Sequence, residues 1–296
     1  MTRAYPFVTV DVFTDRRFGG NPLAVFPDAQ GLTDAQMQSL ATEFNLSETT
    51  FVLPPSDPAN TARVRIFNRV AEMPFAGHPN VGTGWVLAQA GRAPAGTLRF
   101  EEIAGLVEVQ VEADGTTTIA APQPLSLGPQ LAPEAVAACA GLASQDILTA
   151  AHQPVMASVG NSFVIAEVTP DALTRAAPDI GRFRTALSGN PTLASALGPN
   201  RLPLYLYARD GGAVRARMFS PLSGTVEDPA TGSAATPLAA LLLSLTDAAE
   251  ARTDITQGVE MGRPSLLRTT ARRTPDGIRA TVGGGCVPVL RGEALV

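Results

Sequence analysis

The sequence contains no lysine, and all 22 basic residues of the 296-residue chain are arginine. Schiff-base and pyridoxal chemistry need a lysine amine, so both are excluded. The two cysteines, Cys139 and Cys286, do not form a Cys-x-x-Cys motif, so neither a disulfide framework nor a thiolate zinc site is indicated. We expect both to be buried and to act as small hydrophobic side chains.

The sequence also lacks clusters of basic residues and long apolar runs. The net charge of −5 argues against a nucleic-acid or anionic-membrane partner. The best apolar run, PLAALLLSL, is too short to cross a bilayer, and the N-terminus has no secretory apolar region, so we expect a cytoplasmic protein. Two widely separated histidines without a ligand cluster predict no metal, and a small molecule is the expected partner.

The feature that the sequence does contain is an internal repeat. Two stretches, HPNVGTGWVLA and DPATGSAATPLAA, each begin with a titratable residue and Pro, reach Gly and a hydroxyl residue four and five positions on, and then become apolar. They begin at His78 and Asp228, an offset of 150 residues. Each follows an Arg-x-Phe strand and precedes an Asp-Gly hairpin, so the order of elements is repeated. We therefore predict two lobes of the same topology, each with the apolar helix at its centre.

The domain boundary is predicted in the proline-rich stretch at residues 121–133. The N-terminal lobe is then residues 1–122 and the C-terminal lobe is residues 123–285. The last stretch, residues 286–296, has strand character and is predicted to return to the first lobe. With 45% apolar residues, the chain can build a core in each lobe.

The two repeated turns suit an anionic ligand. A glycine-rich turn that opens an apolar helix presents unsatisfied backbone N–H groups and the positive end of the helix dipole. A single turn of this kind is read equally well as a capped helix start. Two matched copies favour a functional role, and we expect both to face one carboxylate or oxyanion across a cleft.

Several side chains in these turns are candidates for function. His78 lies inside a glycine-rich helix start, whereas His152 has no such setting and is expected to be structural. Asp228 is either a functional carboxylate or an N-cap, and its neighbour Glu227 is expected to be solvated. Ser233 is either a ligand contact or a capping hydroxyl.

Glu48 is the candidate base. It lies in NLSETTFV, between a predicted helix over residues 33–44 and a β-branched strand, with Leu46, Phe51 and Val52 around it. Desolvation raises the pKa of a carboxyl group, which suits proton transfer near neutral pH.

Four motifs, NLSETTFV, AEMPFAGHPNVGTGW, VEDPATGSAA and QGVEMGRPS, together closely resemble the PhzF-like phenazine-biosynthesis family, which has the diaminopimelate epimerase fold. The resemblance covers nearly the whole chain. It implies an α+β fold of two pseudo-symmetric lobes, each a barrel-like sheet around a central helix, and a homodimer. The family's founding enzyme isomerises trans-2,3-dihydro-3-hydroxyanthranilate without a metal or organic cofactor.

The resemblance also implies roles for particular residues. Glu48 matches the family's acid/base glutamate. Related epimerases use one cysteine base in each helix-opening turn, but neither turn of this chain contains cysteine. The other implied site residues are His78 and Asp228 as catalytic groups and Gly77, Gly232 and Ser233 as substrate contacts.

The predicted function is a cofactor-independent isomerase that moves a proton within a small carboxylate-bearing substrate, with Glu48 as the base. One alternative is a non-catalytic protein that binds a small molecule on the same fold. The other is a serine hydrolase that uses Ser233, His78 and Asp228. The second is disfavoured because TGSAA is not a G-x-S-x-G elbow and Asp228 shares one turn with Ser233.

Overall fold

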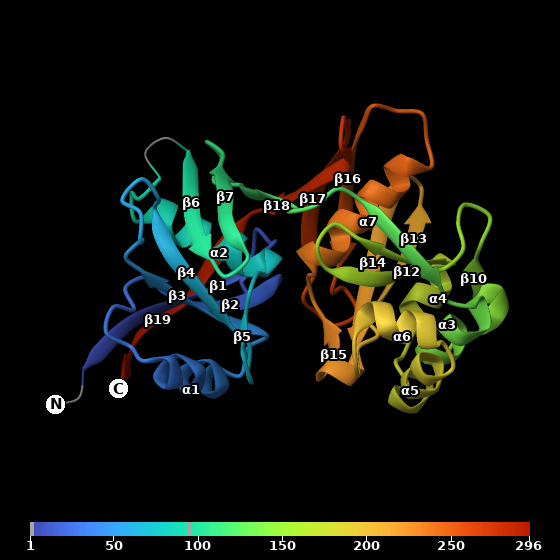
Figure 1. The fold of residues 1–296 in the computed structure, drawn as a ribbon, viewed down its shortest axis with the longest axis horizontal. Helices are drawn as coiled ribbons and strands as arrows, with labels where there is room; N and C mark the ends of the chain where they lie inside the picture. Colours follow the sequence, from blue (N-terminus) through green and yellow to red (C-terminus); the bar gives the residue numbers. More distant parts are fainter. Residues whose placement is uncertain (1–2, 94–95) are drawn as a thin grey trace. The chain divides into compact units, whose positions relative to one another are not determined.

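The computed structural model describes residues 3–93 and 96–296, and the chain divides into two compact units (Figure 1). Unit 1 comprises residues 1–120 and 283–296, and unit 2 comprises residues 121–282. Helices and strands are mixed in both units, which confirms the predicted α+β class.

In unit 1, strands flank two helices that differ in burial. The antiparallel pairs are β1–β2, β1–β19, β3–β4, β4–β5, β6–β7 and β7–β8, and the parallel pairs are β2–β3 and β4–β6. The C-terminal strand therefore lies beside the first strand of the chain. The elements are β1 (Ala4–Val12), β2 (Asn21–Phe26), α1 (Asp34–Phe44), β3 (Glu48–Leu53), β4 (Ala62–Phe67), β5 (Glu72–Met73), α2 (Gly77–Gln89), β6 (Thr97–Glu102), β7 (Gly105–Val111), β8 (Thr117–Ala120) and β19 (Cys286–Leu295).

Unit 2 has more helices in its first half. Its elements are β9 (Ser126–Gln130), α3 (Pro133–Ala140), η1 (Ser144–Asp146), β10 (Ile147–Leu148), β11 (Val155–Ser158), β12 (Ser162–Val168), α4 (Pro170–Arg175), α5 (Ile180–Ser188), α6 (Pro191–Leu197), β13 (Leu204–Asp210), β14 (Ala213–Ser220), η2 (Pro221–Ser223), β15 (Thr225–Asp228), α7 (Gly232–Ser244), β16 (Glu250–Gln257), β17 (Ser265–Thr274) and β18 (Gly277–Gly284).

The strand pairing confirms the predicted repeat. In unit 1, β2 and β3 are parallel and joined through α1, and in unit 2, β12 and β13 are parallel and joined through α4, α5 and α6. The next pairs, β3–β4 and β13–β14, are antiparallel hairpins. The strands on either side of each apolar helix, β4–β6 and β14–β16, are again parallel. The two units therefore share one topology, as expected.

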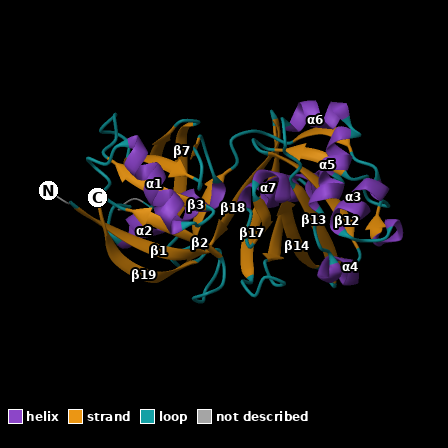
Figure 2. Ribbon diagram, turned by 90° about the horizontal axis from the view of Figure 1, so that it is seen from below, coloured by secondary structure: helices purple, strands orange, loops and turns teal. Residues whose placement is uncertain are grey.

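The helices α2 and α7 are the buried centres of their units. Ten of the thirteen residues in each are buried, as expected for helices that are apolar on all sides. Gly82 and Gly84 allow neighbouring strands to approach α2, because a Cβ at either position would lie 2.6 Å from the side chain of Leu23 or Val109. Figures 1 and 2 show strands around each of the two helices.

Three helices of unit 2, α3, α5 and α6, were absent from the sequence prediction. They pack their apolar residues against β12 and β13 in one hydrophobic cluster that includes Val136, Phe183 and Leu193. Each is a short helix of seven to nine residues that starts with Pro or a polar cap, so its apolar periodicity is brief.

The two cysteines are buried free thiols, as predicted. Burial raises the pKa of Cys139 to about 12 and raises that of Cys286 as well. Both thiols therefore stay protonated near neutral pH.

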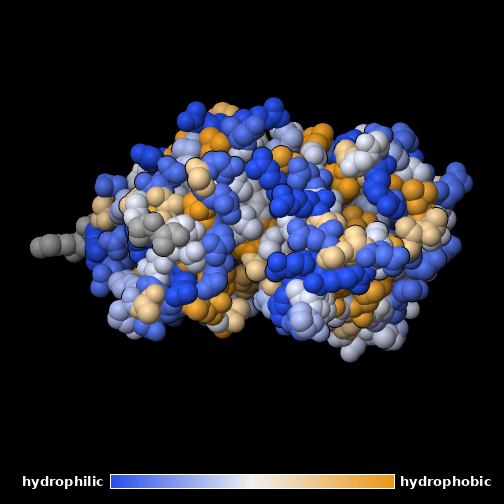
Figure 3. Space-filling model, turned by 90° about the horizontal axis from the view of Figure 1, so that it is seen from above, coloured by the Kyte–Doolittle hydropathy of each residue, from blue (hydrophilic) through white to orange (hydrophobic). Residues whose placement is uncertain are grey.

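Figure 3 shows hydrophilic side chains spread over the visible face of both units. Among the residues that the structure describes, no helix has the length and apolar character needed to cross a membrane.

Candidate active site

The first turn of α2 has no side-chain cap. Ala76 is its N-cap residue, has an extended backbone and makes no side-chain capping hydrogen bond. By contrast, α1 begins with a complete capping box between Thr33 and Gln36. The start of α2 thus leaves backbone donors for another acceptor.

His78, the second residue of α2, is held between two side chains. Its Nε2 lies 3.4 Å from Oε2 of Glu48, and its Nδ1 lies 3.4 Å from Nδ2 of Asn21. Ser47 donates to Oδ1 of Asn21 over 3.2 Å, which turns the amide nitrogen toward the ring. Because that nitrogen is a donor, Nδ1 accepts and the ring proton is on Nε2, facing Glu48.

His78 is neutral near neutral pH. Burial lowers the pKa of the ring to about 3, because a charged imidazolium loses its hydration there. A neutral ring with its proton on Nε2 can donate to the Glu48 carboxylate but cannot serve as a strong acid. The neutral ring therefore lies beside Glu48, although Nε2 and Oε2 form no hydrogen bond at their separation of 3.4 Å.

Glu48 is the first residue of β3, and its side chain is 16% exposed. Side chains alternate along a strand, so Glu48 shares a face with Thr50. Thr50 makes a 2.8 Å hydrogen bond with Thr83 of α2, which shows that this face meets the helix. The expectation that Phe51 lies beside Glu48 was wrong, because Phe51 points to the opposite face and stacks on Phe26.

In unit 2, Asp228 ends β15 just before α7. Its side chain is buried, and its Oδ2 accepts a 2.5 Å hydrogen bond from Oγ1 of Thr231. Thr231 is the N-cap residue of α7, although its hydroxyl does not cap the helix. The alternative of Asp228 as an N-cap was therefore wrong, and α7 begins without a side-chain cap, like α2.

Gln257, which sequence reasoning did not single out, fixes this turn. The residue is fully buried at the end of β16. Its Nε2 donates to the backbone oxygen of Asp228 over 2.7 Å and to Oγ1 of Thr231 over 3.0 Å. Its Oε1 accepts from the backbone N–H of Thr231 over 3.2 Å and from the Tyr205 hydroxyl over 3.0 Å. The signal in the sequence was a polar amide at the end of an otherwise alternating strand.

Gly232 and Ser233 are the first two residues of α7. Gly232 is buried, whereas Ser233 is partly exposed. Its hydroxyl has no hydrogen-bond partner within the described part of the chain, so the capping role proposed as an alternative is absent.

Each unit contains an Arg–Glu ion pair at the same place in its fold, and this match corrects the register of the repeat. Arg65 binds Glu72 through two hydrogen bonds of 2.7 and 2.5 Å, and Arg217 binds Glu227 through two of 2.8 Å. Each arginine also lies over the phenylalanine two residues later. Each glutamate precedes the first residue of the apolar helix, Gly77 or Gly232, by five positions.

This register changes which residues match. The common motif is Glu-x-Pro-x-x-Gly, and the offset between its two copies is 155 rather than 150. His78 therefore matches Ser233, and Asp228 matches Met73, so the prediction that His78 and Asp228 occupy matched places was wrong. The prediction of a solvated Glu227 was also wrong, because its side chain is only 14% exposed.

His152 lies in a hydrogen-bond network of unit 2. Its Nε2 is 2.9 Å from the Tyr207 hydroxyl, which donates to Glu167 over 3.1 Å, and its Nδ1 is 2.8 Å from the backbone oxygen of Gln153. These contacts are those of the structural histidine that was expected.

The structure thus groups the predicted residues in two sets. Glu48, Gly77 and His78 lie together in unit 1, and Asp228, Gly232 and Ser233 lie along the β15–α7 turn in unit 2. Across residues 3–93 and 96–296, no group of three or more His, Cys, Asp or Glu side chains is placed to hold a metal ion.

Comparison with known proteins identifies the family. Residues 10–292 match the phenazine biosynthesis-like protein family, PhzC-PhzF. An uncharacterized isomerase of Mesorhizobium japonicum is 38% identical, with 98% of each chain covered. The trans-2,3-dihydro-3-hydroxyanthranilate isomerase of Pseudomonas fluorescens is 36% identical over 98% of this chain and 99% of its own. A PhzF-family phenazine biosynthesis protein of Bacillus anthracis has a similar structure, with a TM-score of 0.87, 26% identity, and 99% and 100% of the two chains covered.

A two-unit α+β protein with a buried helix at the centre of each unit is the class that the fold defines. The chain belongs to the phenazine biosynthesis-like protein family, and it is an isomerase. The family and the fold that the sequence motifs predicted are confirmed.

Proposed function

We propose that the protein is a cofactor-independent isomerase that moves a proton between two carbons of a small carboxylate-bearing substrate, with Glu48 as the base. The observation that carries this proposal is the pair formed by Glu48 and the neutral ring of His78, 3.4 Å apart at the start of the central helix. A single carboxylate beside a neutral imidazole suits removal of a proton from one face of a substrate.

In this proposal Glu48 takes a proton from one carbon and returns it to another. The electron pair left on the first carbon moves through the substrate's double bond, so no electrons are gained or lost overall. The Nε2–H of His78, which lies 3.4 Å from Oε2 of Glu48, closes to a hydrogen bond with the charged carboxylate when the substrate is bound. Because burial keeps the pKa of His78 at about 3, the ring does not compete with Glu48 for the transferred proton.

In this proposal, the start of α2 stabilises the negative charge that develops on the substrate when Glu48 removes its proton. Its N-terminal turn has no side-chain cap and begins at Gly77, next to His78. Backbone donors and the helix dipole at such a turn stabilise a carboxylate or an enolate-like oxygen. For unit 2 we propose that Gly232 and Ser233 contact the substrate and that Asp228, held by Thr231, takes part in catalysis.

The proposed substrate is trans-2,3-dihydro-3-hydroxyanthranilate or a close analogue. The support is the relative of that name from Pseudomonas fluorescens, which is 36% identical over 98% of this chain. The motif resemblance described above points to the same substrate class, a cyclic amino acid whose carboxylate can accept charge.

The serine hydrolase alternative is disfavoured by the surroundings of His78. In a hydrolytic triad, the histidine Nδ1–H donates to a carboxylate. Here Nδ1 faces the Asn21 amide nitrogen and Nε2 faces Glu48, so neither ring nitrogen is arranged to activate a serine.

The test is isomerisation of trans-2,3-dihydro-3-hydroxyanthranilate in deuterated water, with wild type and Glu48→Gln compared. Wild type should convert the substrate and place label at the receiving carbon, whereas Glu48→Gln should do neither while still binding the substrate. Turnover with unchanged labelling in Glu48→Gln would show that another group is the base. Binding without turnover in the wild type would favour the non-catalytic alternative for this substrate.

A further inference from the structure

The repeat places Glu102 of unit 1 where unit 2 has Gln257. Glu102 ends β6, and Gln257 ends β16. Both strands pair in parallel with the strand that carries the matched arginine, Arg65 or Arg217. The pairs that set this register are Arg63 with Glu101 and Arg215 with Thr256, and in each the arginine lies two residues before the matched one.

Gln257 holds the start of α7 because an amide both donates and accepts. Its nitrogen donates to Asp228 and Thr231, and its oxygen accepts from the N–H of Thr231. An ionised glutamate at the same position could only accept. The matched position in unit 1 therefore lacks the donor that fixes the turn in unit 2, unless Glu102 carries a proton.

The carboxyl oxygens of Glu102 also make no hydrogen bond of normal geometry. Both carboxyl oxygens of Glu102 are buried and have no hydrogen-bond partner among the described residues. The Asn80 amide, which acts on the Glu102 carboxyl, comes from the first turns of α2. Its Nδ2 donates to the backbone oxygen of Ala76, and its Oδ1 is likewise buried without a partner. One proton on Glu102 would supply the donor that this group of acceptors needs.

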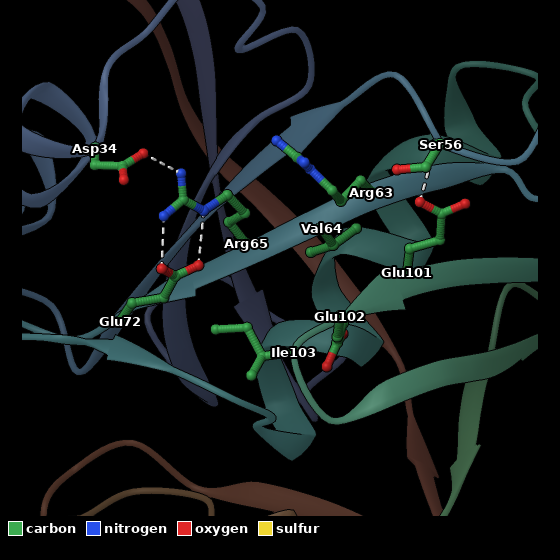
Figure 4. Close-up of a pocket in the computed structure, with 9 residues that line it drawn as sticks. All are labelled: Asp34, Ser56, Arg63, Val64, Arg65, Glu72, Glu101, Glu102 and Ile103. Atoms are coloured by element: carbon green, nitrogen blue, oxygen red, sulfur yellow. Dashed lines mark hydrogen bonds and ion pairs between the residues drawn. The ribbon is translucent and has the colours of Figure 1, made fainter.

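The charged groups that face Glu102 do not supply this donor. Glu102 lines a cavity of about 570 Å³, shown in Figure 4. On its wall, Arg65 is bound to Asp34 and Glu72, and Glu101 is held by Asn60 and by the N–H groups of residues 56 and 57. Arg63, the other cation of β4, is exposed. From α2, the Asn80 amide acts on the Glu102 carboxyl.

The ionisation of Glu102 is consistent with this geometry. Burial raises the pKa of its carboxyl to about 8, against a smaller opposing effect of Asn80. The neighbouring Glu101 differs, because its three N–H donors lower its pKa to about 2. The pKa values of the two adjacent carboxyl groups are therefore shifted in opposite directions.

We propose that Glu102 is a positioning residue that carries a proton in the active enzyme and, in that form, holds the first turn of α2 as Gln257 holds that of α7. Through Asn80 and Ala76 it keeps His78, two residues from Asn80, aligned with Glu48. This inference rests on the proposed function, because the alignment matters to catalysis only if Glu48 is the base.

The first test compares pH profiles of kcat/KM for wild type, Glu102→Gln and the control Asp34→Asn. If only the protonated form is competent, wild type should lose about tenfold in kcat/KM per pH unit above about pH 8. Glu102→Gln, which keeps the donor at all pH values, should remain within about threefold of wild type at pH 7 and lose this alkaline decline. Asp34→Asn changes an exposed carboxylate of the same cavity and should keep the decline. An identical alkaline decline in wild type and Glu102→Gln would overturn the proposal.

The second test does not depend on turnover. Carboxyl-carbon NMR of protein labelled at glutamate, with the Glu102 signal assigned by its loss in Glu102→Gln, measures the ionisation directly. A midpoint near 8 supports a protonated Glu102 even if the proposed substrate is wrong. A midpoint between 4 and 5 overturns the inference and leaves the proposed function untouched.

Discussion

The two helix starts have the same backbone plan and different side chains. Each follows an ion pair between an arginine and a glutamate, and then Pro and Gly in the same spacing. In unit 2 the turn is fixed by the neutral amide of Gln257, whereas unit 1 has the titratable Glu102 at that position. The corresponding ion pairs give the two turns the same backbone plan, and we expect the difference between Glu102 and Gln257 to give them different chemistry.

The proposed base, Glu48, also occurs in one unit only. In the register of the hairpins, Thr49 pairs with Phe67 and Leu204 pairs with Phe219. The residue before Thr49 is Glu48, and the residue before Leu204 is Pro203. Unit 2 therefore has no carboxylate at the place of Glu48, which favours a single base over a symmetric pair.

The strongest test of the difference between the two units compares the activities of Glu48→Gln and Asp228→Asn. We expect Glu48→Gln to lower kcat by on the order of a hundred- to ten-thousand-fold, because the base is removed while size and hydrogen bonding are kept. Asp228→Asn should cost less, about ten- to a hundredfold, since an amide oxygen can still accept from Thr231. Single-turnover kinetics with both variants measures the difference. A larger loss for Asp228→Asn would move the base to unit 2.

The matched ion pairs should differ in their contribution to stability. Arg217 and Glu227 are 7% and 14% exposed, and Arg217 also donates to backbone oxygens of Leu173 and Ala176. Arg217→Met leaves a buried carboxylate unpaired and should lower the free energy of unfolding by about 3 to 5 kcal/mol. Arg65→Met should cost less, about 1 to 2 kcal/mol, because Glu72 is more exposed and can be hydrated.

Urea unfolding of both variants tests this difference, with circular dichroism confirming that each is folded at the start. Equal losses for Arg217→Met and Arg65→Met would show that the two pairs are energetically equivalent, despite their different burial.

The topology could be predicted because local patterns carry it. Alternating strands, apolar helices and Asp-Gly hairpins occur twice in the same order, and each is visible in a short window. The register was five residues wrong because the letters Pro, Gly and hydroxyl happen to recur at an offset of 150. The true register is set by the Arg–Glu contacts between adjacent strands, which become visible only in the structure.

The candidate site was also predictable only in part. Glu48 and His78 stood out through the motif resemblance and their local setting. Asn21 and Gln257 did not, because their roles depend on which strand ends lie beside the helix starts. Glu102 was missed for the same reason, since its burial follows from the parallel pairing of β4 and β6.

The pH dependence of the free energy of unfolding tests the difference between the titratable Glu102 and the neutral Gln257. The folded-state pKa of Glu102, about 8, lies above the ordinary value of 4.5, so its contribution is full below pH 4.5 and is lost as pH rises toward 8. Relative to Glu102→Gln, wild type should lose up to about 1.4 kcal/mol of unfolding free energy per pH unit, or roughly 2 kcal/mol between pH 6 and pH 8. Chemical denaturation at several pH values measures this slope. A constant difference between the two proteins over that interval would contradict the raised pKa.

The smallest expected effect concerns Ser233, the residue that matches His78 in the corrected register. Its partly exposed hydroxyl makes no hydrogen bond within the described chain, so removing it breaks no internal contact. Ser233→Ala should leave the free energy of unfolding within about 0.5 kcal/mol of wild type. If the hydroxyl contacts the substrate, binding should weaken by about 1 kcal/mol for a neutral hydrogen bond, or about 1.5 to 3 kcal/mol if the partner is a carboxylate. Titration calorimetry with the substrate and with its decarboxylated analogue separates the two cases, since only the carboxylate contact disappears with the analogue. An affinity that is unchanged for both ligands would remove Ser233 from the site and leave the chemistry to unit 1 and Asp228.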